Sequence, residues 1–158
     1  MFDLGQPTVG LECYVVVILT VRKGPLHPTR RNALMKILLI LNDPPYGTER
    51  CYNGLRLANA LLKEEPTPEV SVFLMADSVA CAKAGQQTPD GYYNLELMLE
   101  QMVREARLLL CGTCMDARGI GEDELVASAQ RSTMGELTEL TLVADKVLVF
   151  RIAPVHAR

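Results

Sequence analysis

The sequence predicts an α/β fold, a three-layer α/β/α sandwich around a mostly parallel sheet of four or five strands. Three observations support this prediction: aliphatic runs alternate with stretches of helical periodicity, the runs are close to continuous, and Pro and Gly separate the segments. A continuous apolar run is typical of a strand that is covered on both faces. Alternating strands and helices then imply right-handed crossovers and a parallel sheet.

The core is expected to open with a strand at Lys36 to Leu41, where every residue after Lys36 is aliphatic. Residues 42–47 carry two prolines and a glycine beside Asn and Asp, so they are expected to form a loop. Thr48 is placed to cap the following helix, with Glu49 near its positive end. One apolar face is expected on that helix, made of Cys51, Leu55, Ala58 and Leu62.

The middle of the chain predicts two more strands and a second helix. The strands are expected at Val70 to Met75 and at Arg107 to Cys111, and a long connection follows the first of them. A helix is expected before the second strand, because apolar residues recur there at helical spacing. These residues are Leu95, Met98, Leu99, Met102, Val103 and Ala106.

The last third predicts one long helix and a closing strand. Residues 122–127 form a short acidic segment with helical propensity. Thr133 and Glu136 have the spacing of a capping box, which predicts the start of a helix. The final strand is expected at Lys146 to Phe150, and a further short strand between Val126 and Arg131 is an alternative.

Residues 1–34 differ from the rest of the chain, and the predicted domain is residues 35–158. Four basic residues stand there against Asp3 and Glu12, a balance of +2, which leaves −5 for the remainder of a total of −3. The run Val15 to Val21 is too short to span a bilayer, and residues 23–32 have the Pro, Gly and charge of a linker. We expect that Met35 is the native start or that residues 1–34 are a loosely attached extension. An edge strand at the Val15 run is the alternative.

Composition indicates a single cytoplasmic globular domain. The chain has 158 residues, 49% of them hydrophobic and 22% charged. A net charge of −3, no Trp and few aromatics give no reason to expect nucleic acid or a membrane as partner. Five cysteines are an odd number, and the chain has no convincing secretory signal, so we expect a reducing compartment. His27 and His156 are the only histidines, which gives little support to a histidine base.

The pair Cys111 and Cys114 is the most informative feature of the sequence. It follows a buried strand and is expected to open a loop, and ligands bind at the carboxyl ends of strands in open α/β sheets. A thiolate is favoured near positive charge, which Arg118 and the amides of the turn are expected to supply. Cys114 lies in a polar turn, where packing alone does not explain a thiol. The pair therefore indicates sulfur chemistry.

Other sites are less well supported. A structural zinc ion needs four ligands, and only Cys51 and Cys81 remain as single cysteines in the core, so no metal is expected. We interpret those two as core residues, with a role beside Cys111 as the alternative. Thioredoxin-type exchange needs a helix directly after the pair, which Gly119 and Gly121 disfavour. Residues 42–48 lack a Gly-rich phosphate cradle, so no nucleotide cofactor is expected.

With these motifs in view, the chain resembles the DsrE/DsrF-like sulfur-relay family, most closely its YchN-type branch. The most specific similarity is the segment from Cys111 through Cys114 to Arg118 and Gly119. Further similar segments are Met35 to Leu38, Ala58 to Leu61, Gly85-Gln86, Gly91 to Leu95, Ser132 to Gly135 and Ala144 to Leu148. The resemblance covers Met35 to about Phe150.

The resemblance implies a small α/β/α domain that assembles as a homotrimer or homohexamer. It also implies that Cys111 carries sulfur as a persulfide, which it takes from a donor protein or small persulfide and passes to an acceptor. The role of Cys114 stays open, because sulfur carriers of the family do not require it. Two other classes remain: a dithiol oxidoreductase that uses both cysteines, and a ligand-binding assembly module without chemistry.

Overall fold

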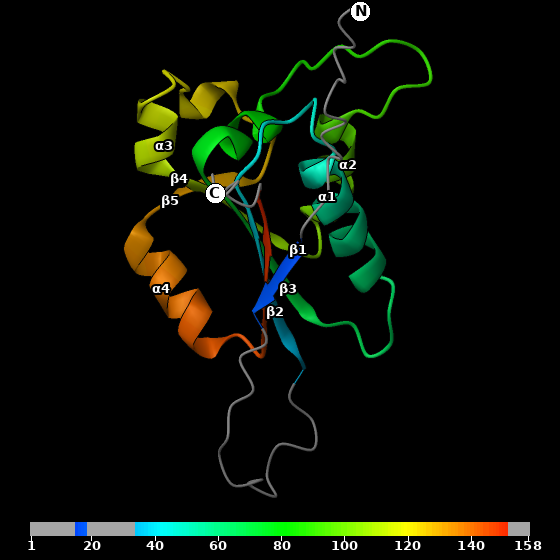
Figure 1. Cartoon of the computed structure of the whole chain (residues 1–158), viewed down its shortest axis with the longest axis vertical. Helices are drawn as coiled ribbons and strands as arrows, with labels where there is room; N and C mark the ends of the chain where they lie inside the picture. Colours follow the sequence, from blue (N-terminus) through cyan, green and yellow to red (C-terminus); the bar gives the residue numbers. More distant parts are fainter. Residues whose placement is uncertain (1–14, 19–33, 152–158) are drawn as a thin grey trace, which may run out of the picture.

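A computed structural model describes the backbone of residues 15–18 and residues 34–151 (Figure 1). The described chain forms one sheet with the strand order β1-β6-β2-β3-β4-β5. The strands are β1 (Val15–Ile18), β2 (Lys36–Leu41), β3 (Glu69–Leu74), β4 (Arg107–Cys111), β5 (Ala129–Ser132) and β6 (Lys146–Phe150). The α-helices are α1 (Arg50–Leu61), α2 (Leu95–Met102), α3 (Gly112–Asp116) and α4 (Met134–Val143), and the 3₁₀-helices are η1 (Ala76–Ala82) and η2 (Glu122–Glu124).

The molecule has the three layers that the sequence predicts. Helices α1 and α2 cover one face of the sheet, and α4 covers the other face (Figure 1). The strands β6, β2, β3, β4 and β5 are all parallel, which confirms the mostly parallel α/β sandwich. The short strand after Val126, weakly indicated by the sequence, is present as β5 and extends the parallel set to five strands.

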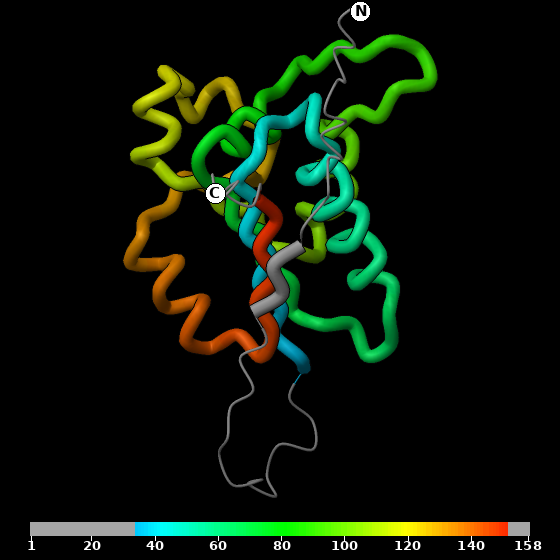
Figure 2. Tube along the Cα trace, in the orientation of Figure 1, coloured from blue at the N-terminus to red at the C-terminus, as the bar shows by residue number. Residues whose placement is uncertain are grey.

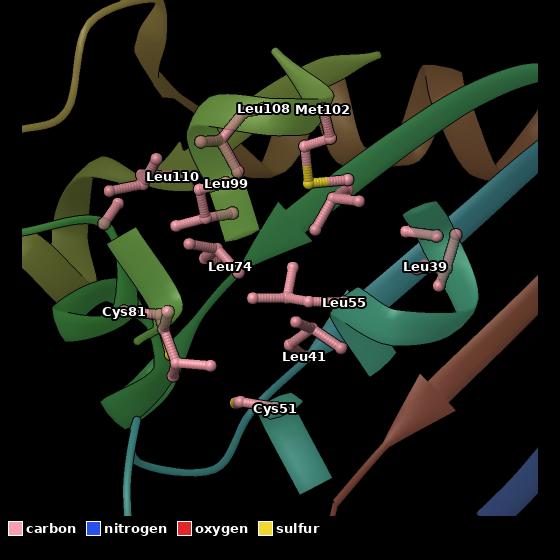
Figure 3. Packing of buried hydrophobic residues seen from close by; sticks show 14 of the residues in the cluster. Leu39, Leu41, Cys51, Leu55, Leu74, Cys81, Leu99, Met102, Leu108 and Leu110 are labelled. Atoms are coloured by element: carbon pink, nitrogen blue, oxygen red, sulfur yellow. The ribbon is translucent and has the colours of Figure 1, made fainter. Parts of the chain in front are cut away.

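The core consists of two hydrophobic clusters, one on each side of the sheet. Alternate residues of β2 supply them: Ile37, Leu39 and Leu41 belong to the larger cluster, and Leu38 to the smaller one. Figure 3 shows the larger cluster, in which Leu55 from α1 and Leu99 from α2 pack against the strands. Strand side chains buried on both faces explain why the runs in the sequence are continuous.

The chain leaves the centre of the sheet and returns to it. Strands β2, β3, β4 and β5 follow one another outward, and β6 then pairs with the other side of β2 (Figure 2). A crevice in a parallel sheet forms at the carboxyl ends of its strands. The loops after β2, β3 and β4 all leave the sheet at that edge, so η1 and α3 come together there; the two elements are in contact.

The backbone of Val15–Ile18 forms β1, which pairs antiparallel with β6. The alternative expectation, an edge strand at the Val15 run, is therefore the one that the structure shows. The linker-like segment 23–32 lies outside the described residues, as do His27 and His156. A native start at Met35 stays a prediction, which the intact mass of the protein from its own cells would test.

Two helix starts were predicted, with different outcomes. Thr133 caps α4 as expected: its Oγ1 accepts a hydrogen bond from the Glu136 N–H at 3.3 Å. The predicted cap at Thr48 is wrong, because α1 begins after Glu49, which has a left-handed backbone with φ of 54° and makes no side-chain cap. That left-handed residue turns the chain into the helix one position after Thr48. The acidic segment 122–127 is helical only over η2.

Candidate functional site

The two predicted thiols lie at the end of β4, where strand passes directly into helix. Cys111 is the last residue of β4 and the N-cap of α3, and Gly112 is the first helical residue. The expectation of a loop here is wrong. A Cβ at Gly112 would lie 2.8 Å from Nε of Arg131, so the missing side chain lets that guanidinium lie against the start of the helix. A side chain at position 112 would therefore displace the Arg131 guanidinium.

Cys111 and Cys114 are in contact, and their exposures differ. The Cys111 residue is 6% exposed and packs in the smaller cluster with Phe73 and Leu109. Cys114 is half-buried and contacts both clusters. Both thiols are free, and the Cys111 thiol lies close enough to Cys114 to raise its pKa. A helix of less than two turns thus places two thiols side by side at the carboxyl edge of the sheet.

The thiol of Cys114 has a second partner from η1. The backbone N–H of Ala76 donates a hydrogen bond to Sγ of Cys114 at 3.2 Å. Ala76 has a left-handed backbone with φ of 51°, an uncommon conformation for alanine. The next turn is fixed because the Ser78 hydroxyl donates to the Leu41 carbonyl at 2.6 Å. The neighbouring strands therefore hold the donor at Cys114 in place.

Burial raises the pKa of the Cys114 thiol, and the neighbouring Cys111 thiol raises it further. The Ala76 N–H and the positive charge of Arg118 act in the opposite direction and lower that pKa. The net shift is upward, so Cys114 holds its proton more strongly than an ordinary thiol. In this state Cys114 can donate a hydrogen bond to an anionic sulfur at Cys111.

Arg118, the third predicted site residue, lies beside Cys114. Its NH1 donates to the Cys114 carbonyl at 3.0 Å, and its Nε and NH2 donate to Oδ1 of Asp77 at 3.0 and 2.6 Å. The structure therefore brings the three predicted residues to one edge, with Arg118 tied to Cys114 and to η1. Sequence reasoning missed Asp77 and Ala76, because their proximity to Cys114 depends on β3 and β4 being neighbours.

A second arginine beside the pair was also missed. Arg131 of β5 lies against Gly112, and its NH2 forms an ion pair with Oδ2 of Asp116 at 2.6 Å. The hydrogen bond from Arg131 lowers the pKa of Asp116, and the carboxylate raises the pKa of Arg131 in return. The signal in the sequence was only a basic residue at the end of a weakly indicated strand.

Cys51 and Cys81 form a second thiol pair inside the core. Both are fully buried, at the start of α1 and near the end of η1 (Figure 3). The Cys51 thiol lies close enough to Cys81 to raise its pKa, and Sγ of Cys51 donates to the Asp43 carbonyl at 2.9 Å. Both cysteines belong to the larger cluster, which confirms their interpretation as core residues. Their contact with each other was not foreseen.

The arrangement of side chains and the lengths of the helices bear on metal binding and on membrane crossing. Within the part of the chain that the structure describes, no group of three or more His, Cys, Asp or Glu side chains is arranged to hold a metal ion. Over the same residues, no helix has the length and apolar content needed to cross a membrane.

Known proteins with this arrangement place the chain in a family. A profile of the DsrE/DsrF-like family matches residues 35–150, which include every strand of the parallel set. The chain belongs to the DsrE/DsrF-like family. The match ends at the last residue of β6 and begins one residue before β2. The DsrE/DsrF-like domain is therefore the whole parallel sandwich.

Individual relatives agree with this assignment. Protein YchN of Escherichia coli K12 is 41% identical over 118 residues, which are 74% of this chain and all of YchN. The crystal structure of YchN superposes with a TM-score of 0.71 over the same shares of the two chains. Sulfurtransferase TusD of Cronobacter sakazakii is 27% identical over 129 residues, 73% of this chain and all of TusD.

A more distant structure shows the fold alone. MTH1491 of Methanobacterium thermoautotrophicum, a protein of unknown function, has a TM-score of 0.56 at 12% identity. The superposition covers 70% of this chain and 93% of that one.

Proposed function

We propose that this DsrE/DsrF-like protein is a sulfur carrier, in which Cys111 accepts sulfane sulfur as a persulfide and passes it on. The observation that carries the proposal is the placement of Cys111: it ends a strand at the carboxyl edge of the sheet, in contact with a second thiol and close to two arginines. The family and the distant relative named as a sulfurtransferase support a role in sulfur relay.

The transfer needs only thiolate chemistry. The Cys111 thiolate attacks the outer sulfur of a donor persulfide, the S–S bond of the donor breaks, and the donor leaves as a thiolate. The product is a persulfide on Cys111, with no net oxidation or reduction. An acceptor thiolate then attacks the outer sulfur of that persulfide, and Cys111 leaves as a thiolate again. The donor is a persulfide on a protein or a small molecule, and the acceptor is a thiol on a protein or a small molecule.

Cys114 and Arg118 are proposed to support this cycle. Because the Cys114 thiol holds its proton, it can donate a hydrogen bond to the persulfide anion and shield it from oxidation. Arg118, fixed by Asp77, adds positive charge at this edge. In a side reaction, the Cys114 thiolate attacks the inner sulfur of Cys111 and expels hydrosulfide, which leaves a disulfide that a thiol reductant must reopen.

We also propose that the protein is a cytoplasmic homotrimer or homohexamer. Helix α4 exposes three large apolar side chains, Met134, Leu142 and Val143, and Leu142 is 64% exposed. Neighbouring exposed apolar residues on one helix are typical of an interface. Sedimentation velocity should show the oligomer, and Leu142→Glu should shift it toward smaller species; a wild-type monomer would contradict the proposal.

Intact-mass measurement after treatment with a small persulfide donor tests the carrier function. Wild type is expected to gain about 32 Da, the mass of one sulfur atom. Cys111→Ser should lose the adduct, whereas Cys114→Ser should keep it. Cys81→Ser is a matched control, since it removes a thiol away from the site. Absence of an adduct on Cys111 with every donor would contradict the proposal.

A dithiol oxidoreductase is the second candidate, and one observation favours it. The chain passes from Cys111 directly into α3, and a pair of contacting thiols at the start of a helix is the arrangement used in dithiol exchange. This activity predicts a Cys111–Cys114 disulfide on mild oxidation and reduction of insulin by the dithiol form. Lack of insulin reduction, together with a stable adduct on Cys111, would exclude the oxidoreductase and support the carrier function.

A further inference from the structure

We propose that Arg131 is a positioning residue that stabilises the anionic form of Cys111, and that Gly112 and Asp116 hold its guanidinium in place. Only the identity of that anion as a persulfide rests on the proposed function. The effect of Arg131 on the Cys111 thiolate does not depend on the proposed function. The two arginines of the site then have separate tasks, since Arg118 is bound to the backbone of Cys114.

The first support is the close approach of Arg131 to the residue after Cys111. A Cβ built on Gly112 would lie 2.8 Å from Nε, 2.9 Å from Cζ and 3.1 Å from NH2 of Arg131. Three guanidinium atoms thus occupy the space that a side chain at position 112 would take. The absence of a side chain at Gly112 lets the positive group lie against the backbone between Cys111 and Cys114.

The second support is the fixed orientation of Arg131. Its NH2 is bound to Asp116 at the end of α3, and its own strand is paired with β4. In that pairing Ser132, the next residue, lies opposite Cys111. The guanidinium therefore bridges β5 and α3 across the turn that carries both thiols.

The third support is electrostatic and mutual. The Asp116 carboxylate is the main cause that raises the pKa of Arg131, and the charges of Glu122 and Cys111 raise it further. The interaction is mutual. If the charge on Cys111 stabilises the charged form of Arg131, then Arg131 stabilises the anionic form of Cys111 by the same free energy. Arg118 has the corresponding effect on the other thiol, since its charge lowers the pKa of Cys114.

The charged and titratable groups around Cys111 come from six elements and the turn after α3. Because Arg131 is about one third exposed, water screens its charge and the effect is modest. The groups are Cys114 and Asp116 of α3, Arg118 after it, Asp77 of η1, Arg131 of β5, Glu122 of η2, and Glu136 of α4, which is paired with Arg107 of β4 and bound by Ser132.

The test is the pH dependence of Cys111 alkylation by iodoacetamide, followed by peptide mass spectrometry of the full chain. Arg131→Gln is expected to move the midpoint of the profile of alkylation rate against pH to higher pH. It should also slow alkylation at pH 7 about two- to fivefold, which corresponds to the free energy of an interaction between partly exposed charges. Arg131→Lys should restore much of the rate because it keeps the charge. Arg104→Gln, which removes an exposed arginine outside the site, should leave the rate unchanged.

Gly112→Ala provides a second route, because a methyl group must displace the guanidinium without removing it. The same upward shift of the midpoint is expected. Added salt should slow the wild type more than Arg131→Gln, since screening acts on the charge that the variant lacks.

An unchanged midpoint in both Arg131→Gln and Gly112→Ala would overturn the proposal, as would a shift in Arg118→Gln alone. The readout does not involve sulfur transfer. If Arg131→Gln shifts the midpoint as expected but wild-type Cys111 never forms a persulfide, the proposed function is overturned and this inference stands.

Discussion

The part of the chain that the structure describes holds two pairs of contacting thiols, and they differ in almost everything except that contact. Cys111 and Cys114 lie at the carboxyl edge of the sheet beside two arginines. Cys51 and Cys81 are fully buried beside the ion pair of Asp43 and Arg50, and the charge of Asp43 is among the causes that raise the pKa of Cys81. One pair therefore includes a half-buried thiol and lies beside two exposed arginines, whereas the other pair lies entirely inside the core.

The difference shows that proximity of two thiols does not define a functional site. A buried thiol in apolar surroundings keeps its proton and packs as a small hydrophobic residue. Burial raises the pKa of Cys81 well above its ordinary value, and the Cys51 thiol raises it further. At the edge of the sheet the charge of Arg118 opposes this effect on Cys114.

The largest expected effect is on alkylation of the native protein. Cys111 and Cys114 should react about a thousandfold faster than Cys51 and Cys81 at neutral pH, because the core pair reacts only after local opening. Peptide mass spectrometry after a short pulse of iodoacetamide measures the ratio. In urea the four thiols should react alike, and equal rates in the native protein would remove the distinction between the pairs.

A smaller effect is expected on stability. Cys81→Ser places a hydroxyl in an apolar site and should lower the free energy of unfolding by about 1–3 kcal/mol. Cys114→Ser should change it by less than about 0.5 kcal/mol, since a serine oxygen can also accept the Ala76 hydrogen bond. Urea unfolding at one fixed protein concentration compares the two. An equal loss of unfolding free energy in both variants would contradict the distinction between the two thiol pairs.

The smallest effect is expected at alkaline pH. The raised pKa of Cys81 means that, above the ordinary thiol pKa of 9.0, the unfolded chain releases a proton that the folded chain keeps. The free energy of unfolding should therefore fall with rising pH, by at most about 1.4 kcal/mol per pH unit. The decline should be shallower in Cys81→Ala than in Cys114→Ala. If the free energy of unfolding falls equally steeply with pH in both variants, this prediction is wrong.

Much of the framework was predictable because local patterns carry it. The continuous run of β2 and the capping residue Thr133 mark their elements directly. The placement of Cys111 at a strand end also follows from the run before it. Thr48 was misleading, because a suitable capping residue does not act when the next residue turns left-handed.

The surroundings of the thiols were not predictable, because they come from segments far apart in the chain. Ala76 is 38 residues from Cys114, and the two meet only because β3 and β4 are neighbours. The sequence also gave no sign that α3 begins directly at Gly112, since the glycines after it disfavoured a helix. A helix of five residues is short enough to end before them.

The sequence by itself determined the α/β sandwich, the family and the position of Cys111 at the end of a strand. Periodicity and turn residues act over a few neighbours, so they survive in the linear order of the chain. The tertiary structure decided that the core cysteines touch, that Arg118 binds beside Cys114, and that Arg131 lies against Gly112. These contacts depend on the order in which the strands pair, which only the folded sheet sets.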